Sequence, residues 1–179
     1  MMRRWFVNVA AFALIAVATH FIVFGGTPYL IMSRLMTQTA ARGGGYNAAV
    51  STGQLPTAAS RAVVRPSPDL LYTACAFDIG DGPVLIGGTP SQAYWSVALY
   101  ASNTDNFFVL DDRAANGKAA FVVLSSREML ARIPPEYKSL RVVEPPSAKG
   151  LLLFRFLVLD DSDLASAREM QQSVVCRKL

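Results

Sequence analysis

The longest apolar stretch of the chain lies near its N-terminus. The twenty residues from Trp5 to Phe24 carry only three polar side chains, those of Asn8, Thr19 and His20. An α-helix of twenty residues is about 30 Å long, which matches the hydrocarbon core of a bilayer. The pattern therefore predicts a transmembrane helix within residues 1–26.

The charges and small residues around this helix bear on its topology. Arg3 and Arg4 precede the apolar stretch, so the positive-inside rule leaves the N-terminus in the cytoplasm and exports the remainder. Cleavage as a signal peptide after Ala18 is one alternative, and a buried core helix is another. Because the apolar stretch continues through Phe24, beyond the usual signal-peptide core, an uncleaved anchor is favoured. The sequence thus predicts a single-pass inner (plasma) membrane protein with a periplasmic C-terminal domain.

Residues 27–68 are predicted to form a helical extension and a linker. The glycines at 25–26 should end the first helix, and Thr27-Pro28 is a typical helix start. The second helix would run to about Ala41, with an apolar stripe made of Leu30, Ile31, Leu35 and Met36. Residues 43–68 are rich in Gly, Ala, Ser, Thr and Pro, which is typical of a tether or irregular arm.

From about residue 69 onward, apolar and polar residues alternate with a period of two, as in β-strands. Seven short strands are predicted, at Leu70–Ile79, Val84–Ile86, Gln92–Tyr100, Phe107–Leu110, Ala119–Leu124, Leu140–Val143 and Leu151–Leu159. A helix from about Asp161 or Ser162 to Val174 closes the domain. The spacing predicts a mainly β domain in residues 69–179, an antiparallel sandwich or jelly-roll-like fold.

Turn and cap signals separate these strands. Gly80–Pro83 has the composition of a turn, and Asn116-Gly117 that of a β-hairpin. Ser125 and Glu128 have the spacing of a capping box, which predicts a short helix before Pro134.

The charge distribution supports this topology and removes one class of function. The 179 residues contain 17 Lys and Arg against 13 Asp and Glu, a net charge of +4 that alone would suggest nucleic-acid binding. Residues 1–59 contain four arginines and no acidic residue, whereas residues 60–179 contain 13 basic and 13 acidic residues. The excess therefore lies beside the membrane segment, and no nucleic-acid partner is expected.

Cys75 and Cys176 are the two cysteines of the chain. In an oxidising periplasm they favour a disulfide, here between the first strand and the last helix, with two separate buried thiols as the alternative. Closing a loop of about 100 residues stabilises a protein by up to about 4.7 kcal/mol in the chain-entropy model. A catalytic thiol is not expected, because the single histidine, His20, lies in the membrane segment.

The densest polar segment runs from Ser102 to Arg113. It offers side-chain oxygens that could bind a ligand or act as acid and base, those of Asn103, Asp105, Asn106, Asp111 and Asp112. The same residue types are the usual components of turns, and the spacing matches no EF-hand loop. Turn formation is favoured, and ligand contact is the alternative.

Two further side chains are candidates for binding. Arg155 lies within an otherwise apolar strand, where it could block pairing at a sheet edge, form an ion pair inside the sheet, or bind an anion. Trp95 could line a sugar or lipid groove, although an aromatic residue in an alternating strand is usually part of the core.

The Gly-x-Gly at Gly80–Gly82 precedes a strand rather than a helix, so no nucleotide-binding loop is predicted. With two distant cysteines and one histidine, no metal site and no cofactor are expected.

At these residues the sequence resembles the domain-of-unknown-function family 1254, in its short membrane-anchored alphaproteobacterial form. The matching stretches are Arg65–Tyr72, Cys75, Asp78–Pro83, Tyr94–Ser96, Ser102–Phe108, Pro146–Arg155 and Cys176. The resemblance implies an all-β fold with no established activity, and it supplies no catalytic residue. It also implies a separate companion from family 1214, which is often fused to this family or encoded nearby.

Two hypotheses follow for the function. The first is a non-enzymatic binding or assembly module, anchored in the inner membrane and acting with a partner envelope protein. The alternative is a periplasmic sugar- or lipid-binding domain or hydrolase that uses the polar cluster 103–112.

Overall fold

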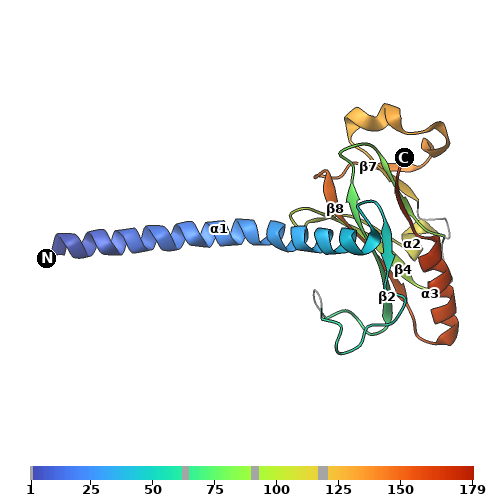
Figure 1. Cartoon of the computed structure of the whole chain (residues 1–179), viewed down its shortest axis with the longest axis horizontal. Coiled ribbons are helices and arrows are strands. Elements are labelled where there is room, and N and C mark those ends of the chain that lie inside the picture. Colours follow the sequence, from blue (N-terminus) through green and yellow to red (C-terminus); the bar gives the residue numbers. More distant parts are fainter. Residues whose placement is uncertain (1, 62–64, 90–92, 117–120) are drawn as a thin grey trace.

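The N-terminal quarter of the chain is one long helix that projects away from a β-domain (Figure 1). The computed structural model describes residues 2–61, 65–89, 93–116 and 121–179. Helix α1 spans Met2–Gly43 without interruption, so the predicted break at the glycines 25–26 is wrong. Instead of capping a second helix, the Thr27 hydroxyl donates to the Val23 carbonyl at 2.5 Å. Such side-chain bonds help apolar helices to accommodate residues like Pro28.

The last turns of α1 bury a stripe that differs from the predicted one. Met32, Met36 and Ala40 are buried, at a spacing of four residues that keeps them on one face of the helix. Leu30 and Ile31, two members of the predicted stripe, are exposed instead. The side of the helix that meets the β-domain is therefore set by the methionines.

The β-domain consists of two sheets with a shared core. Its strands are β1 (Ala49–Ser51), β2 (Leu70–Asp78), β3 (Val84–Gly87), β4 (Trp95–Ala101), β5 (Asn106–Asp111), β6 (Val122–Leu124), β7 (Arg141–Val143), β8 (Lys149–Leu157) and β9 (Val175–Lys178). The first sheet has the order β1-β2-β8-β4-β5 and the second β7-β6-β3-β9. All pairs are antiparallel except β6 with β7. The predicted mainly β class, with a C-terminal helix α3 at Asp161–Ser173, is confirmed.

Alternation along the strands builds the core, as the sequence predicts. The alternate residues on one face of β2 and β4 are all buried, namely Leu71, Cys75, Phe77, Trp95, Val97 and Leu99, as is Ile79 just beyond β2. They pack against even-numbered residues of β8, including Phe154 and Phe156, and against residues of the second sheet such as Ile86. These contacts fix which face of the first sheet points inward.

Two local expectations are wrong, a hairpin at Asn116-Gly117 and a capping box at Ser125. Strands β5 and β6 lie in different sheets, so Asn116 does not join them as a hairpin; it ends the short helix α2 (Asp112–Ala115), and Gly117 lies outside the described residues. The capping box also fails, since the Ser125 hydroxyl donates to the Ser126 carbonyl. Two 3₁₀ helices follow, η1 at Arg127–Arg132 and η2 at Pro135–Tyr137.

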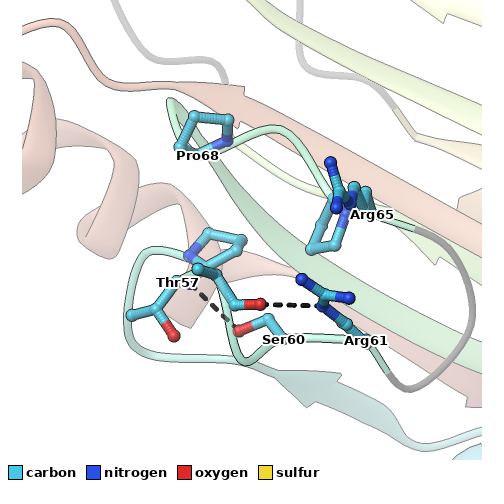
Figure 2. A pocket seen from close by; sticks show the side chains of 8 residues that line it. Thr57, Ser60, Arg61, Arg65 and Pro68 are labelled. Carbon is cyan, nitrogen blue, oxygen red and sulfur yellow. Dashed lines mark hydrogen bonds between the residues drawn. The ribbon is translucent and has the colours of Figure 1, made fainter.

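The predicted tether is partly ordered. It contributes the edge strand β1, and the segment between β1 and β2 folds on itself around a cavity of about 400 Å³ (Figure 2). A turn at Thr57–Ser60 forms one wall, in which the Thr57 N–H donates to the Ser60 hydroxyl at 3.0 Å. We call residues 52–68 the arm.

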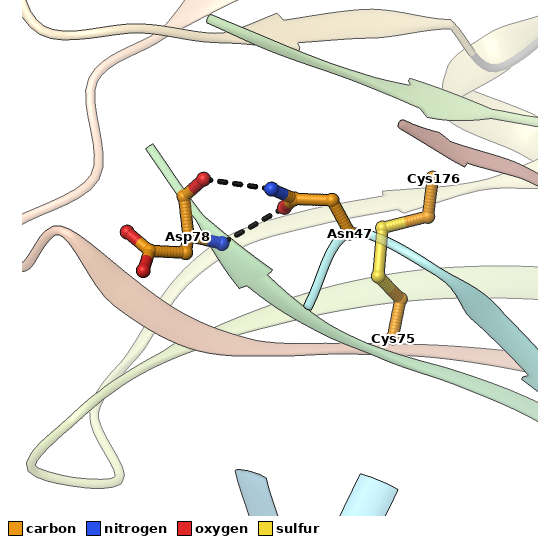
Figure 3. Close-up of a disulfide and its surroundings, with 4 residues drawn as sticks. All are labelled: Asn47, Cys75, Asp78 and Cys176. Carbon is orange, nitrogen blue, oxygen red and sulfur yellow. Dashed lines mark hydrogen bonds between the residues drawn. A yellow bond between two sulfur atoms is a disulfide. The ribbon is translucent and has the colours of Figure 1, made fainter. Parts of the chain in front are cut away.

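The disulfide between Cys75 and Cys176 joins the two sheets (Figure 3). Cys75 lies on β2 and Cys176 on β9, with 6.5 Å between their Cα atoms. The predicted pairing is thus present, but Cys176 lies on a strand rather than on the last helix. The C-terminal strand follows α3 at once, and it pairs with β3 to form an edge of the second sheet.

Candidate binding face on the five-stranded sheet

The first sheet has an outer face, opposite to the core, and α1 covers one end of it. Met32, Met36 and Ala40 pack there against Ala76 of β2 and Leu151 of β8. The helix therefore meets the sheet at the end of β2 and the beginning of β8. The opposite end of the same face carries a different set of side chains.

A polar clasp holds the helix end on the sheet. The Asn47 side chain donates to the Asp78 carbonyl at 2.9 Å and accepts from the Asp78 N–H at 2.8 Å, as a neighbouring strand would (Figure 3). Asn47 adopts a left-handed conformation with φ of 60°, which asparagine tolerates better than most residues. Beside it, Lys149 forms an ion pair with the Asp78 carboxylate at 3.3 Å and lies over the Tyr46 ring.

Polar residues form one row across four strands at the other end of the outer face. In the strand register, Tyr72 of β2 lies opposite Arg155 of β8, Arg155 opposite Ser96 of β4, and Ser96 opposite Asp111 of β5. Side chains of directly paired residues lie on the same side of a sheet. We call these four residues the polar row.

Two atoms in the centre of the polar row are buried without a hydrogen-bond partner. They are Nε of Arg155 and Oγ of Ser96, whose residue is only 2% exposed. A buried donor or acceptor without a partner costs about 1–3 kcal/mol, so such groups are uncommon without a functional reason. Nearby on the same face, Val109 is 55% exposed, so this end of the face is open to a partner.

The position of Arg155 corrects one interpretation from the sequence. Strand β8 lies in the middle of the first sheet, between β2 and β4, so Arg155 does not protect a sheet edge. It also forms no ion pair with any carboxylate in the described part of the chain. Contact with an external anion, the third interpretation, stays a prediction for its guanidinium.

The structure divides the predicted polar cluster between the two ends of β5. Asn103 and Asp105 lie in the β4–β5 turn, where the Asn103 amide donates to the Asp105 carboxylate at 2.6 Å. Asn106 begins β5, whereas Asp111 and Asp112 follow one another at its far end. These residues therefore do not form one group.

The two aspartates at the far end of β5 have different roles. Asp111 caps α2 by accepting from the Ala114 N–H at 2.8 Å, and it also belongs to the polar row. One carboxylate oxygen of Asp112 is buried and has no hydrogen-bond partner.

Trp95 lies in the core rather than in a groove. It is 1% exposed and contacts the Phe154 ring at a centroid distance of 6.3 Å. Its neighbour Tyr94 is 42% exposed and is the accessible aromatic residue of the pair.

Two members of the polar row, Tyr72 and Ser96, were not predicted from the sequence. Alternation was the available signal, because Ser96 lies between the inward residues Trp95 and Val97 and must face outward. Within the ranges that the structure describes, no three His, Cys, Asp or Glu side chains come close enough to hold a metal ion.

Comparison with known proteins gives a family but no activity. The model of a protein family described as "Protein of unknown function (DUF1254)" matches residues 46–178, which begin just after α1 ends. No functionally curated protein matches the chain.

Two crystal structures of larger proteins match part of the chain. The VPA0106 protein of Vibrio parahaemolyticus has a TM-score of 0.57 and 17% identity, with 64% of this chain and 29% of that protein covered. An uncharacterised protein from Burkholderia cenocepacia has a TM-score of 0.45 and 19% identity, with 78% and 38% covered. The chain thus spans well under half of each of these proteins, and the Vibrio structure supports the fold alone.

Proposed function

We propose, from the premise that the chain belongs to the DUF1254 family of proteins of unknown function, that it is a single-pass inner-membrane protein whose periplasmic β-domain binds a partner envelope protein. In this proposal the chain is a binding or assembly module and not an enzyme. Its partner is a separate protein, and a member of family 1214 encoded nearby is the first one to test.

The observation that carries this proposal is the exposure of α1. The helix is long and apolar enough to cross a membrane, and none of its most apolar 18-residue window is buried against the rest of the chain. Phe12, Ile22 and Phe24 are each more than 70% exposed. Such side chains are stable in contact with lipid, whereas a soluble core helix would bury them.

Charge and redox chemistry support the proposed direction of the helix in the membrane. Arg3 and Arg4 favour a cytoplasmic N-terminus, which places the β-domain outside. The Cys75–Cys176 disulfide supports the same direction, because such bonds persist in the periplasm and are rare in the cytoplasm.

The partner is proposed to dock on the open end of the outer face. Arg155 is partly exposed, and its guanidinium forms no ion pair in the described part of the chain, so its terminal nitrogens can donate to a partner. A carboxylate or carbonyl group of the partner could accept from them, and such a bond would be charge-assisted.

Affinity capture tests this proposal with the full chain solubilised in detergent. The chain is co-expressed with the neighbouring family 1214 protein, and the amount of that protein recovered is measured. We expect stoichiometric recovery with the unmodified chain and at least tenfold less with Arg155→Met, which corresponds to about 1.4 kcal/mol.

Arg127→Met is the matched control. Arg127 is an exposed arginine at the start of η1, outside the polar row. Its Nε pairs with the Glu144 carboxylate at 2.9 Å. Recovery with this variant should be unchanged. Failure of the unmodified chain to recover the partner would refute this choice of partner, and equal losses for both variants would refute the docking face.

A further inference from the structure

We propose that the membrane-facing side of the β-domain docks on the phosphate groups of anionic phospholipids through Arg34, Arg42, Arg61 and Arg65. This inference rests on the membrane anchor of the proposed function. It adds a second contact with the lipid, made by the domain and the end of the helix.

The charges of the chain are divided at residue 69. Residues 1–68 contain six arginines and no acidic residue, and the first acidic residue is Asp69. Residues 69–179 contain 11 basic and 13 acidic residues, so this part carries a net negative charge. The four arginines that follow the apolar stretch are therefore not compensated within their own segment.

None of the four arginines forms an ion pair with a carboxylate among the residues that the structure describes. All four are exposed, and the ion pairs among the described residues involve Arg127, Lys149 and Lys178 instead. An exposed guanidinium without a carboxylate is free to make bidentate contacts with a phosphate group.

The arm presents two of these guanidinium groups together. Arg61 follows the turn at Thr57–Ser60 and is held by a bond from its Nε to the Ala58 carbonyl at 3.0 Å. This bond leaves the two terminal nitrogens of Arg61 available. Figure 2 shows the Arg61 and Arg65 side chains on the same side of the cavity in the arm. Both guanidinium groups can therefore contact anionic groups on this side of the arm, with the Ser60 hydroxyl as a further donor.

The arm extends from the β-domain on the same side as the last turns of α1, the side from which the helix approaches (Figure 1). Arg34 and Arg42 lie on the same turns of α1, outside the buried stripe of Met32, Met36 and Ala40. The helix therefore brings both pairs of arginines toward the surface of the membrane that it crosses. Basic groups next to a membrane segment bind anionic lipids in this way.

The test uses the full chain in lipid nanodiscs and hydrogen–deuterium exchange read by mass spectrometry. One set of nanodiscs contains phosphatidylcholine alone, and the other contains phosphatidylcholine and phosphatidylglycerol in equal parts. We expect amides of residues 52–61 to exchange severalfold more slowly in the anionic nanodiscs, and we expect high salt to remove this difference because it screens surface charges.

Two double variants make the result specific. Arg61→Gln with Arg65→Gln should abolish the difference between the lipids. Arg127→Gln with Lys138→Gln removes two exposed cations from the η1–η2 region and should leave the difference intact. Equal exchange of the unmodified chain in both lipids would overturn the proposal.

Further measurements distinguish lipid docking from binding of free phosphate and from failure of the membrane anchor. If inorganic phosphate slows exchange in neutral nanodiscs as much as phosphatidylglycerol does, the arm binds free phosphate and the lipid assignment is wrong. If the chain does not enter nanodiscs at all, the anchor itself is refuted and this inference with it. Entry without a lipid-dependent difference overturns only the docking.

Discussion

Single residues of the polar row show a conflict between stability and binding. Arg155 occupies the centre of a sheet with its Nε buried and unpaired, and the Ser96 hydroxyl beside it is in the same state. An apolar side chain of similar volume at position 155 would avoid this cost. The presence of a residue that lowers the stability of the isolated chain is most simply explained if that residue contacts another molecule.

Replacing Arg155 should therefore not harm the fold. We expect Arg155→Met to leave the free energy of unfolding unchanged or to raise it by about 1–3 kcal/mol, because the unpaired Nε is removed. Arg141→Met is the comparison, because the Arg141 Cζ lies 5.0 Å from the centre of the Phe108 ring. This variant should lower the free energy of unfolding by about 0.5–1 kcal/mol. Urea unfolding of the full chain in detergent measures both values. A marked loss of stability for Arg155→Met would show that its guanidinium has a partner within the chain.

Asp160 provides a pH-dependent test at the start of α3. The Ser162 hydroxyl and then the backbone N–H groups of Asp163 and Ser162 hold the pKa of the Asp160 carboxyl below its usual value of 3.8. The ionised form is thus favoured by folding, so its stabilising effect is full at neutral pH and is lost as the pH falls through the lowered pKa.

The variant Asp160→Asn should remove this pH dependence. An asparagine can still cap the helix but does not titrate, so its midpoint of thermal unfolding should approach that of the unmodified chain as the pH falls toward about 3. Asp161→Asn changes a neighbouring carboxyl that does not accept these bonds and serves as the control. A constant difference between Asp160→Asn and the unmodified chain at all pH values would contradict this assignment.

At the scale of elements, the contact between α1 and the first sheet positions everything else. The buried stripe of two methionines and an alanine packs on Ala76 and Leu151. Directly after the helix, the Asn47 side chain forms two hydrogen bonds with the backbone of Asp78. The helix end is thus an integral part of the sheet surface.

The variant Asn47→Ala tests the clasp. It removes two hydrogen bonds to Asp78 and places alanine in a left-handed conformation, so we expect a loss of about 2 kcal/mol in the free energy of unfolding. Asn103→Ala removes an asparagine whose bonds stay within an exposed turn, and it should cost less than about 1 kcal/mol. Urea unfolding compares the two, and equal losses would show that the clasp has no special role.

How far the sequence predicts these elements depends on how local the signal is. Alternation placed Leu70–Ile79 and Leu151–Leu159 close to the observed β2 and β8, because a strand with one buried face records that face at every second residue. The strands β1 and β9 were missed, because β1 lies in the segment rich in Gly, Ala, Ser, Thr and Pro and β9 follows α3 without a turn signal between them. Their pairing depends on strands far away in the sequence.

Nonlocal effects also explain the errors in the helix and the site. The break at Gly25–Gly26 was predicted from local propensities, which the long helix overrides. The polar row could not be predicted, because it depends on the order β2-β8-β4-β5, which no local pattern in the chain specifies. Arg155 was recognised as unusual from its apolar neighbours, but its place in a central strand required the structure.

For the molecule as a whole, the disulfide joins the two sheets as well as two distant parts of the chain. Cys75 and Cys176 are 101 residues apart, and each is buried in the core between the sheets. Closing a loop of this length restricts the unfolded chain strongly. The second sheet, which has only short strands, depends on this link more than the first.

Removing the disulfide should therefore lower stability substantially. For Cys75→Ala with Cys176→Ala we expect a loss of up to about 4.7 kcal/mol, measured by urea unfolding. Mass analysis of the unmodified chain without reductant should show a mass two hydrogens below that of the reduced chain. Two free thiols in the exported protein would contradict the pairing.

The central claim is that α1 anchors the chain with its β-domain on the periplasmic side of the inner membrane. The most direct measurement is protease digestion of intact spheroplasts that carry the chain with a C-terminal epitope, followed in the washed membrane fraction. We predict that the epitope remains with the membranes after an alkaline wash and is removed by external protease without lysis. Loss of the epitope from the membranes in the wash, or its protection until the spheroplasts are lysed, would contradict the account.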